Sequence, residues 1–133
     1  MQYKIALFGE AEKGKFKTPY KCKSLMQLLN TFGNPPKDSF GLTFAIQALM
    51  YEREVLFFRV NEEGFGYSDY FPPLKNLSIT GKDAKIDAIC MPGVGDPKII
   101  DVTESICKIH KSILLTTEKD LFDYLTSFST LEK

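Results

Sequence analysis

The sequence predicts a single α/β domain over residues 1–133, built in three layers: a mostly parallel sheet of four or five strands flanked by about four helices. Three observations lead to this prediction. Strand-like runs alternate with stretches of helical periodicity. The strand-like runs are nearly all apolar, as expected for strands covered on both faces. A length of 133 residues with 44% apolar content is typical of one globular domain, and no repeat or linker divides the chain.

The first half of the chain is expected to hold two strands, two helices and a short extended piece. Ser24 and Gln27 form a capping box, and Gly33 is placed to end the helix that follows. Asp38 or Ser39 can cap a second helix, whose apolar residues recur at helical spacing. The expected elements are a strand at 3–8, an extended piece at 20–23, a helix at 25–32, a helix ending near Met50 and a strand at 55–60.

The second half begins with the least regular stretch. Residues 61–85 hold several glycines and two adjacent prolines, so we expect a long loop there that is either functional or hides short elements. Asp96 and Pro97 are a favourable N-cap and first position for a helix that reaches His110. Thr117 can cap a last helix. The other expected elements are a strand at 86–91 and a strand at 113–115.

Composition and charge exclude several classes of protein. Lys plus Arg equals Asp plus Glu at 17 each, so there is no basic excess of the kind that marks nucleic-acid binders. No apolar run approaches the ~20 residues of a membrane span. Cys22, Cys90 and Cys107 form no metal or disulfide pattern, and the chain opens directly into a strand rather than a signal peptide. We therefore expect a cytoplasmic protein, or one assembled in the cytoplasm.

Two glycine-containing loops follow predicted strands. Residues 9–16 match the pattern GxxxxGK, but Phe16 stands where a phosphate loop needs Ser or Thr, and Pro19 follows where a helix should begin. A charged surface turn is the favoured interpretation. The second loop, residues 91–97, carries Asp96 at a helix start, where it would oppose an anion. It is interpreted either as a ligand loop at the strand ends or as a tight turn that aims a helix.

No set of residues forms a catalytic, cofactor-binding or metal-binding pattern. His110 is the one histidine, and no nucleophile or orienting acid can be matched to it from sequence. The protein is therefore predicted not to be an enzyme and to bind no cofactor or metal. Four aromatic residues of the 61–85 stretch are either an exposed interface or a cover for the core edge, namely Phe65, Tyr67, Tyr70 and Phe71.

Several segments, in order, resemble the core domain of contractile phage tail sheath proteins. Residues 5–33 resemble that family's first strand, its G-x-A-x-x-G loop, and a helix ending in F-G. Residues 41–50 and 55–60 resemble its glycine-containing helix and its strand ending in R-V. Residues 87–97 resemble its later strand with the P-G-V-x-D-P turn, and 113–115 its next strand.

The resemblance implies a sheath-like α/β core without the N-terminal and C-terminal arms that link sheath subunits. The family's large insertion between the R-V strand and the P-G-V strand is cut to about 25 residues here, and Lys15 replaces a proline usual in the first loop. These departures weaken the expectation that the chain polymerises as sheath subunits do, but they do not change the expected fold.

Two functions of different classes remain open from the sequence. The first, which the resemblance implies, is a non-enzymatic structural or assembly protein of a contractile phage tail or related injection machine. It would be located in the cytoplasm, or in a virion or tail particle assembled there. It would contact phage tail or sheath-like proteins, or its own copies as an oligomer, and neither nucleic acid nor membrane. The alternative is a small-ligand-binding or regulatory domain with its site at the strand carboxyl ends, near Gly9, Gly93 and Gly95.

Overall fold

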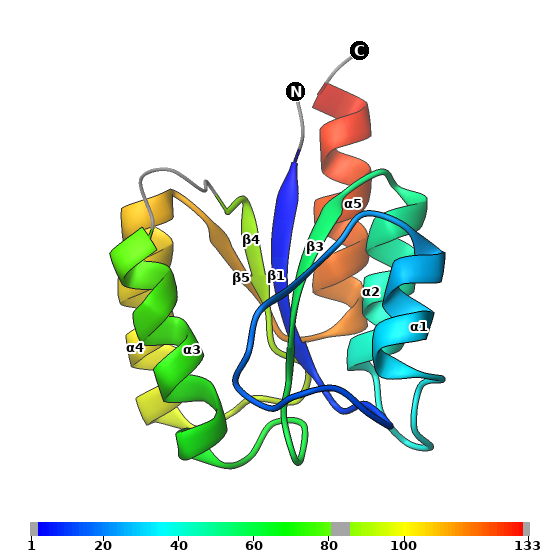
Figure 1. The fold of residues 1–133 in the computed structure, drawn as a ribbon. Helices are drawn as coiled ribbons and strands as arrows, with labels where there is room; N and C mark the ends of the chain where they lie inside the picture. The colour runs from blue at the N-terminus through cyan, green and yellow to red at the C-terminus, as the bar shows by residue number, and fades with distance from the viewer. Residues whose placement is uncertain (1–2, 81–85, 132–133) are drawn as a thin grey trace.

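A computed structural model describes residues 3–80 and 86–131, with side chains for 3–77 and 86–126. It confirms the α/β fold: a mostly parallel five-stranded sheet with helices on both faces (Figure 1). In chain order the elements are β1 (Lys4–Gly9), β2 (Tyr20–Cys22), α1 (Leu25–Phe32), α2 (Gly41–Met50), β3 (Glu54–Arg59), α3 (Tyr67–Thr80), β4 (Ala88–Cys90), α4 (Pro97–His110), β5 (Ile113–Leu115) and α5 (Glu118–Leu131).

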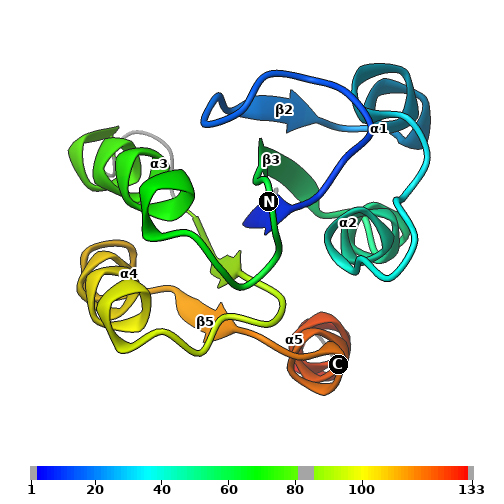
Figure 2. The same ribbon diagram turned by 90° about the horizontal axis from the view of Figure 1, so that it is seen from below.

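The sheet has the order β2-β3-β1-β4-β5, with β1 at its centre. β1 pairs in parallel with β3 on one side and with β4 on the other, and β5 extends the parallel sheet beyond β4. β2 pairs with β3 in the antiparallel direction and forms one edge. Helices α1, α2 and α5 cover one face, and α3 and α4 cover the other (Figures 1 and 2).

The apolar central strand divides its side chains between two cores. Successive residues of a strand point to opposite faces, so Ile5 and Leu7 join the core beneath α1, α2 and α5, whereas Ala6 and Phe8 join the core beneath α3 and α4. All four side chains are completely buried. This double coverage is what the nearly continuous apolar run predicted.

Local capping signals are confirmed at three helices. The Ser24 hydroxyl accepts a hydrogen bond from the Gln27 amide, and the Asp96 carboxylate accepts one from the Lys98 amide. The Thr117 hydroxyl accepts one from the amide of Asp120. These caps were predictable because donor and acceptor lie within three residues of each other.

The capping prediction for α2 is wrong. The N-cap position is Phe40 rather than Asp38 or Ser39, and its side chain accepts no capping hydrogen bond. Instead, the carboxylate of Glu63 accepts hydrogen bonds from the amides of Phe40 and Gly41. The acceptor lies more than twenty residues away in sequence, so no local pattern indicates it.

The predicted loop at 61–85 is also corrected, because α3 occupies residues 67–80. Pro72 and Pro73 lie inside this helix, where each removes a backbone donor. The helix forms nevertheless because Tyr70, Leu74 and Leu77 recur at helical spacing and bury their side chains against the sheet. Tertiary packing thus outweighs the local preference. Residues 81–85 of the predicted loop lie outside the described part of the chain.

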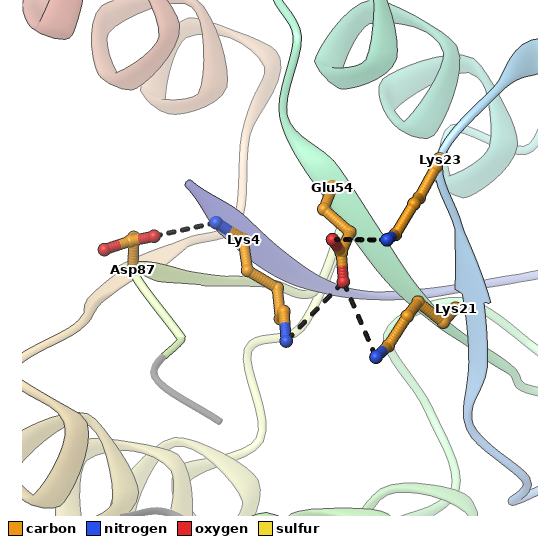
Figure 3. Close-up of polar contacts among 5 residues, drawn as sticks. All are labelled: Lys4, Lys21, Lys23, Glu54 and Asp87. Atoms are coloured by element: carbon orange, nitrogen blue, oxygen red, sulfur yellow. Dashed lines mark hydrogen bonds and ion pairs between the residues drawn. The ribbon is translucent and has the colours of Figure 1, made fainter. Parts of the chain in front are cut away.

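A group of charged residues closes the amino end of the sheet (Figure 3). The Glu54 carboxylate, on a residue that is 6% exposed, lies 3.5 Å from the ammonium of Lys4 and 3.9 Å from those of Lys21 and Lys23. The Asp87 carboxylate accepts a hydrogen bond of 2.7 Å from the Lys4 amide. A buried carboxylate is tolerated when cations compensate its charge, so this group holds β1, β2 and β3 together.

We predict that the Leu74→Ala variant will be much less stable than the wild type, because α3 depends on its packing against the sheet. The completely buried Leu74 side chain leaves a cavity when truncated, at a cost of about 2–5 kcal/mol in the free energy of unfolding. Urea unfolding followed by circular dichroism measures the change. Met26, which is 72% exposed on α1, is the matched control, and Met26→Ala should change stability by less than about 0.5 kcal/mol. Equal losses in the two variants would contradict the role assigned to α3.

Candidate functional site

The carboxyl ends of β1 and β4 are the place where this topology favours a ligand. The chain leaves β1 and reaches β3 on one side of it, then leaves β3 and reaches β4 on the other side. Such a reversal in strand order opens a crevice outside the strand ends, and α/β proteins commonly bind ligands there. The N-terminus of α2 points into this region, and helix N-termini attract anions.

A carboxylate of the protein itself occupies the N-terminus of α2. Glu63, in the segment after β3, accepts hydrogen bonds from the amides of Phe40 at 2.7 Å, Gly41 at 2.8 Å and Glu10 at 2.9 Å. The Glu63 amide in turn donates to the carboxylate of Glu10 at 2.9 Å. Two of the amides at the start of α2 that could bind a phosphate are therefore already used, and two carboxylates stand where an anionic ligand would have to enter.

Close backbone approaches complete the closure. A Cβ atom at Gly9 would lie 2.5 Å from the Cα of Gly41, so the end of β1 and the start of α2 touch without an intervening side chain. Gly64, at a φ of +90°, packs against the carbonyl of Gly93, and its amide donates to the Tyr70 hydroxyl at 2.8 Å. The chain's own atoms thus fill the crevice near Gly9.

The GxxxxGK loop packs against other parts of the same chain and does not enclose an anion. The amides of Glu12 and Lys13 donate to the carbonyl of Phe32, at the end of α1. The Phe16 ring stacks on the guanidinium of Arg59, with the central carbon 4.2 Å from the ring centroid. The loop is therefore anchored to α1 and β3 as a surface turn.

A cavity of about 290 Å³ remains near the ends of β4 and β5. Gly93, predicted to lie near a ligand site, is one of its lining residues. Aromatic rings from the start of α2 form one wall, and hydroxyls and a carboxylate from the start of α5 form another. The lining residues are Phe40, Phe44, Pro92, Gly93, Thr116, Thr117 and Glu118.

A second, larger hollow lies between α2 and α5 and was not predicted from the sequence. Its volume is about 540 Å³, and we call it the α2–α5 groove. The exposed apolar side chains of Met50 and Phe122 flank it, at 70% and 55% exposure. Each helix carries apolar residues on its outer side, and these are visible in the sequence. The sequence does not show, however, that α2 and α5 lie next to each other. The lining residues are Gln47, Met50, Tyr51, Glu118, Lys119, Phe122 and Leu125.

His110 is a structural residue. It is 4% exposed at the end of α4, and its Nε2 donates to the carbonyl of Leu77 at 3.1 Å, which links α4 to α3. Among the described residues, no group of three or more His, Cys, Asp or Glu side chains is arranged to hold a metal ion.

The cysteines are buried thiols rather than nucleophiles. Burial raises the pKa of Cys22 to about 11, and burial, with a smaller effect of Glu104, raises the pKa of Cys107 to about 11. Burial also raises the pKa of Cys90, with smaller effects from Glu63 and Asp120. The thiolate is the reactive form of cysteine, so none of these groups is prepared for catalysis.

The four aromatic residues predicted as an interface do not form one surface. Tyr70 is completely buried in the core under α3, so it is not available to a partner. Phe65 and Tyr67 are exposed, at 62% and 37%, and Phe71 is partly buried with its ring stacked on that of Tyr67. Helical spacing places Tyr70 on the inner face of α3, so it is separated from the exposed rings of Phe65 and Tyr67.

Neither a scan against protein-family models nor a search of curated proteins finds a match for this chain. Within residues 3–80 and 86–131, none of the helices has the length and apolar character needed to cross a membrane.

We predict that Glu63→Ala will lower the free energy of unfolding by about 2–4 kcal/mol, because three backbone amides lose a charged acceptor. The variant should also acquire an anion site. Inorganic phosphate should raise the melting temperature of Glu63→Ala more than that of the wild type, since the freed amides can bind it. Differential scanning fluorimetry in phosphate and in chloride buffers measures both effects.

The neighbouring and exposed Glu62 provides the control. Glu62→Ala should change stability by less than about 0.5 kcal/mol and should show no added response to phosphate. If Glu63→Ala behaved like Glu62→Ala, the carboxylate would not be closing the crevice.

We predict that the three thiols will be unreactive in the folded protein. At about pH 8, native protein treated with iodoacetamide should stay unmodified, because each thiol is buried and, with its raised pKa, protonated. Unfolding in guanidinium chloride should expose all of them to alkylation, as measured by intact mass. Rapid alkylation of one thiol in the native state would reveal a nucleophile and weigh against a non-enzymatic role.

Proposed function

We propose that this protein is a non-enzymatic structural or assembly component of a contractile phage tail or related injection machine, and that it acts through protein–protein contacts. One observation carries the proposal most directly: the Glu63 carboxylate occupies the N-terminus of α2, where an α/β domain of this topology would bind an anionic ligand. In the described part of the chain, the start of α2 is therefore taken up by a carboxylate of the protein, at the place where nucleotide-dependent α/β proteins bind a phosphate.

The surface of the protein supports a role in protein contacts. Large apolar side chains are exposed on α1, on the α2–α5 groove and near the start of α3, among them Met26, Met50, Phe65 and Phe122. Exposed apolar side chains gathered around a groove are typical of sites that bind proteins. In addition, the sole histidine and the three cysteines are buried.

The order of segments that resembles sheath cores supports the choice of machine. The residues that carry the resemblance have structural roles here. Gly9 permits the contact between β1 and α2, and Gly93, at the end of β4, has a φ of +77°, which favours glycine. Backbone packing at Gly9 and backbone conformation at Gly93 thus account for these glycines without a ligand.

We predict that the purified protein will bind components of a contractile tail. Assembled sheath, tail tube and baseplate particles should each be incubated with the protein and sedimented, and the pellet examined by gel electrophoresis and negative-stain microscopy. Binding to at least one particle is expected, whereas an unrelated α/β domain of similar size should stay in the supernatant. The proposal fails if the protein stays in solution with every particle.

A second candidate function is the binding of a small ligand, and the cavity of about 290 Å³ favours it. Its aromatic and hydroxyl walls suit a small uncharged or cationic ring compound, since Glu118 lies at its border and Glu63 opposes anions. A thermal-shift screen of metabolites tests this function. It would gain support if a compound stabilised the wild type but not Phe40→Ala. No shift with any compound would remove it.

A further inference from the structure

We propose that the β2 edge of the sheet, together with the outer side of α1, binds an extended acidic segment of another protein. The proposal rests on the assembly function and names the chemistry of one partner for it. We call this surface the lysine face. It consists of five exposed lysines on residues 13–23 and of apolar side chains that lie beside them. The lysines are Lys13, Lys15, Lys17, Lys21 and Lys23.

Positive charge is concentrated in this part of the chain. Residues 13–37 contain six lysines and no aspartate or glutamate, although the whole chain is neutral. Two carboxylates lie beside the five lysines of the face. Glu12 accepts a hydrogen bond from the amide of Asn34, and Glu54 is 6% exposed. The five lysines exceed these two carboxylates by three charges, and Lys4 and Arg59 are not counted in that excess.

The first three lysines lie in a loop that is anchored to β3. The Arg59 guanidinium donates to the carbonyl of Gly14 at 2.7 Å and stacks on the Phe16 ring. Among the residues that the structure describes, no acidic side chain lies within ion-pair distance of these three lysines. Their charge is therefore available to a partner, and the loop that carries them is held against the sheet.

The other two lysines are only partly neutralised. Lys21 and Lys23 each lie 3.9 Å from the carboxylate of Glu54, and Lys4 lies 3.5 Å from it (Figure 3). One carboxylate among three ammonium groups compensates one charge. The Lys21 and Lys23 side chains remain 57% and 67% exposed, so a second acidic group can approach them from solvent.

The lysines follow the edge of the sheet as a row. Phe16 forms a bridge with Arg59 at the carboxyl end of β3, and Cys22 pairs with Val55 near its amino end. The segment between them therefore runs along β3, over roughly 17–20 Å for a strand of this size. β2 is the last strand on this side of the sheet. An extended peptide of about six residues matches a row of this length.

An apolar surface adjoins the row on α1, which lies next to β2 (Figure 2). Leu25, Met26 and Leu29 share one side of the helix, because their spacings are three and four residues. All three are exposed, Met26 most of all at 72%. The row of cations thus continues into an apolar patch, and a partner that combines acidic with apolar side chains complements both parts.

The combination favours a protein segment over other polyanions. A nucleic acid would contact the lysines, but its phosphate backbone offers nothing to the aliphatic side chains of α1. Binding to a membrane would require apolar side chains that reach into the acyl region. The side chains of Phe16, Leu25 and Leu29 are each less than half exposed. Acidic protein is therefore the partner that fits the face best.

Lysines on an edge strand also have a protective role, because they prevent pairing with the sheets of other molecules. That role requires charge only on the strand. Here three of the five lysines precede β2, and the exposed apolar side chains follow it on α1. The extra lysines and the apolar patch are explained by a partner, and the same charges that repel basic or neutral strands admit an acidic one.

A synthetic peptide tests the lysine face. The probe is a fluorescently labelled peptide of about ten residues, with glutamates over about six positions and leucines at one end. Binding is followed by fluorescence anisotropy. We expect the affinity to fall about tenfold or more between about 0.05 M and 0.5 M salt, because added ions screen the lysines. A peptide with lysine in place of each glutamate should not bind.

Charge-reversal variants locate the binding. K13E/K15E should weaken binding of the acidic peptide about tenfold or more. K98E/K108E makes the same charge change at two exposed lysines of α4, outside the lysine face, and should bind like the wild type. Melting temperatures establish that each variant is folded. Equal affinities of K13E/K15E and K98E/K108E for the peptide would overturn the proposal.

The apolar part of the face has its own matched pair of variants. Met26→Ser should weaken binding of the leucine-containing peptide about threefold or more, because Met26 contacts its apolar end. Met50→Ser removes an equally exposed methionine on α2, which is 70% exposed and outside the face, and should have no effect. If Met26→Ser bound as the wild type does, and single-stranded DNA or phosphatidylserine vesicles bound more tightly than the peptide, the face would belong to one of those partners and the proposal would be wrong.

The outcomes also separate this proposal from the assembly function. If the protein bound tail particles but not the acidic peptide, and K13E/K15E bound the particles as well as the wild type does, the lysine face would be rejected and the assembly function would stand. If the peptide bound as expected but no tail particle did, the lysine face would stand and the assembly function would fail.

Discussion

The arrangement of this protein depends on the carboxylate of Glu63. Helix α2 supplies no side-chain cap of its own, and the carboxylate from the segment after β3 takes its place. The same carboxylate binds the amide of Glu10 just beyond β1, and Glu10 returns a hydrogen bond to Glu63. Because the favourable interaction of a carboxylate with helix amides is strongest where water is excluded, this one group joins the two central strands to the helix that covers them.

With the crevice near β1 closed, the groups that a ligand or partner can reach lie elsewhere on the domain. The sheet is covered on both faces, the cysteine and histidine side chains are buried, and the strand ends near β1 are occupied by Glu63 and by the contact of Gly9 with Gly41. The accessible parts of the domain include the outer surface of the helices, the β2 edge and the cavity of about 290 Å³ near the ends of β4 and β5.

A net charge of zero conceals an uneven distribution. Lysines gather at the β2 edge, where Glu54 neutralises only part of their charge, and acids gather along α5. The balanced composition predicts no general excess of basic residues. Net charge is a sum over the whole chain, however, so it does not show where the fold places charges of each sign.

The sequence by itself determined the features that depend on neighbours in the chain. The order of the strands and of the helices other than α3, the caps at Ser24 and Asp96 and the stop at Gly33 all arise from groups within a few residues of each other. Tertiary structure decided the rest. Glu63 reaches amides 22 to 53 residues away, and α3 forms over two prolines because Tyr70 and its neighbours bury apolar area against the sheet. These contacts join distant segments, and their energies appear only when the chain is packed, so no local pattern reveals them.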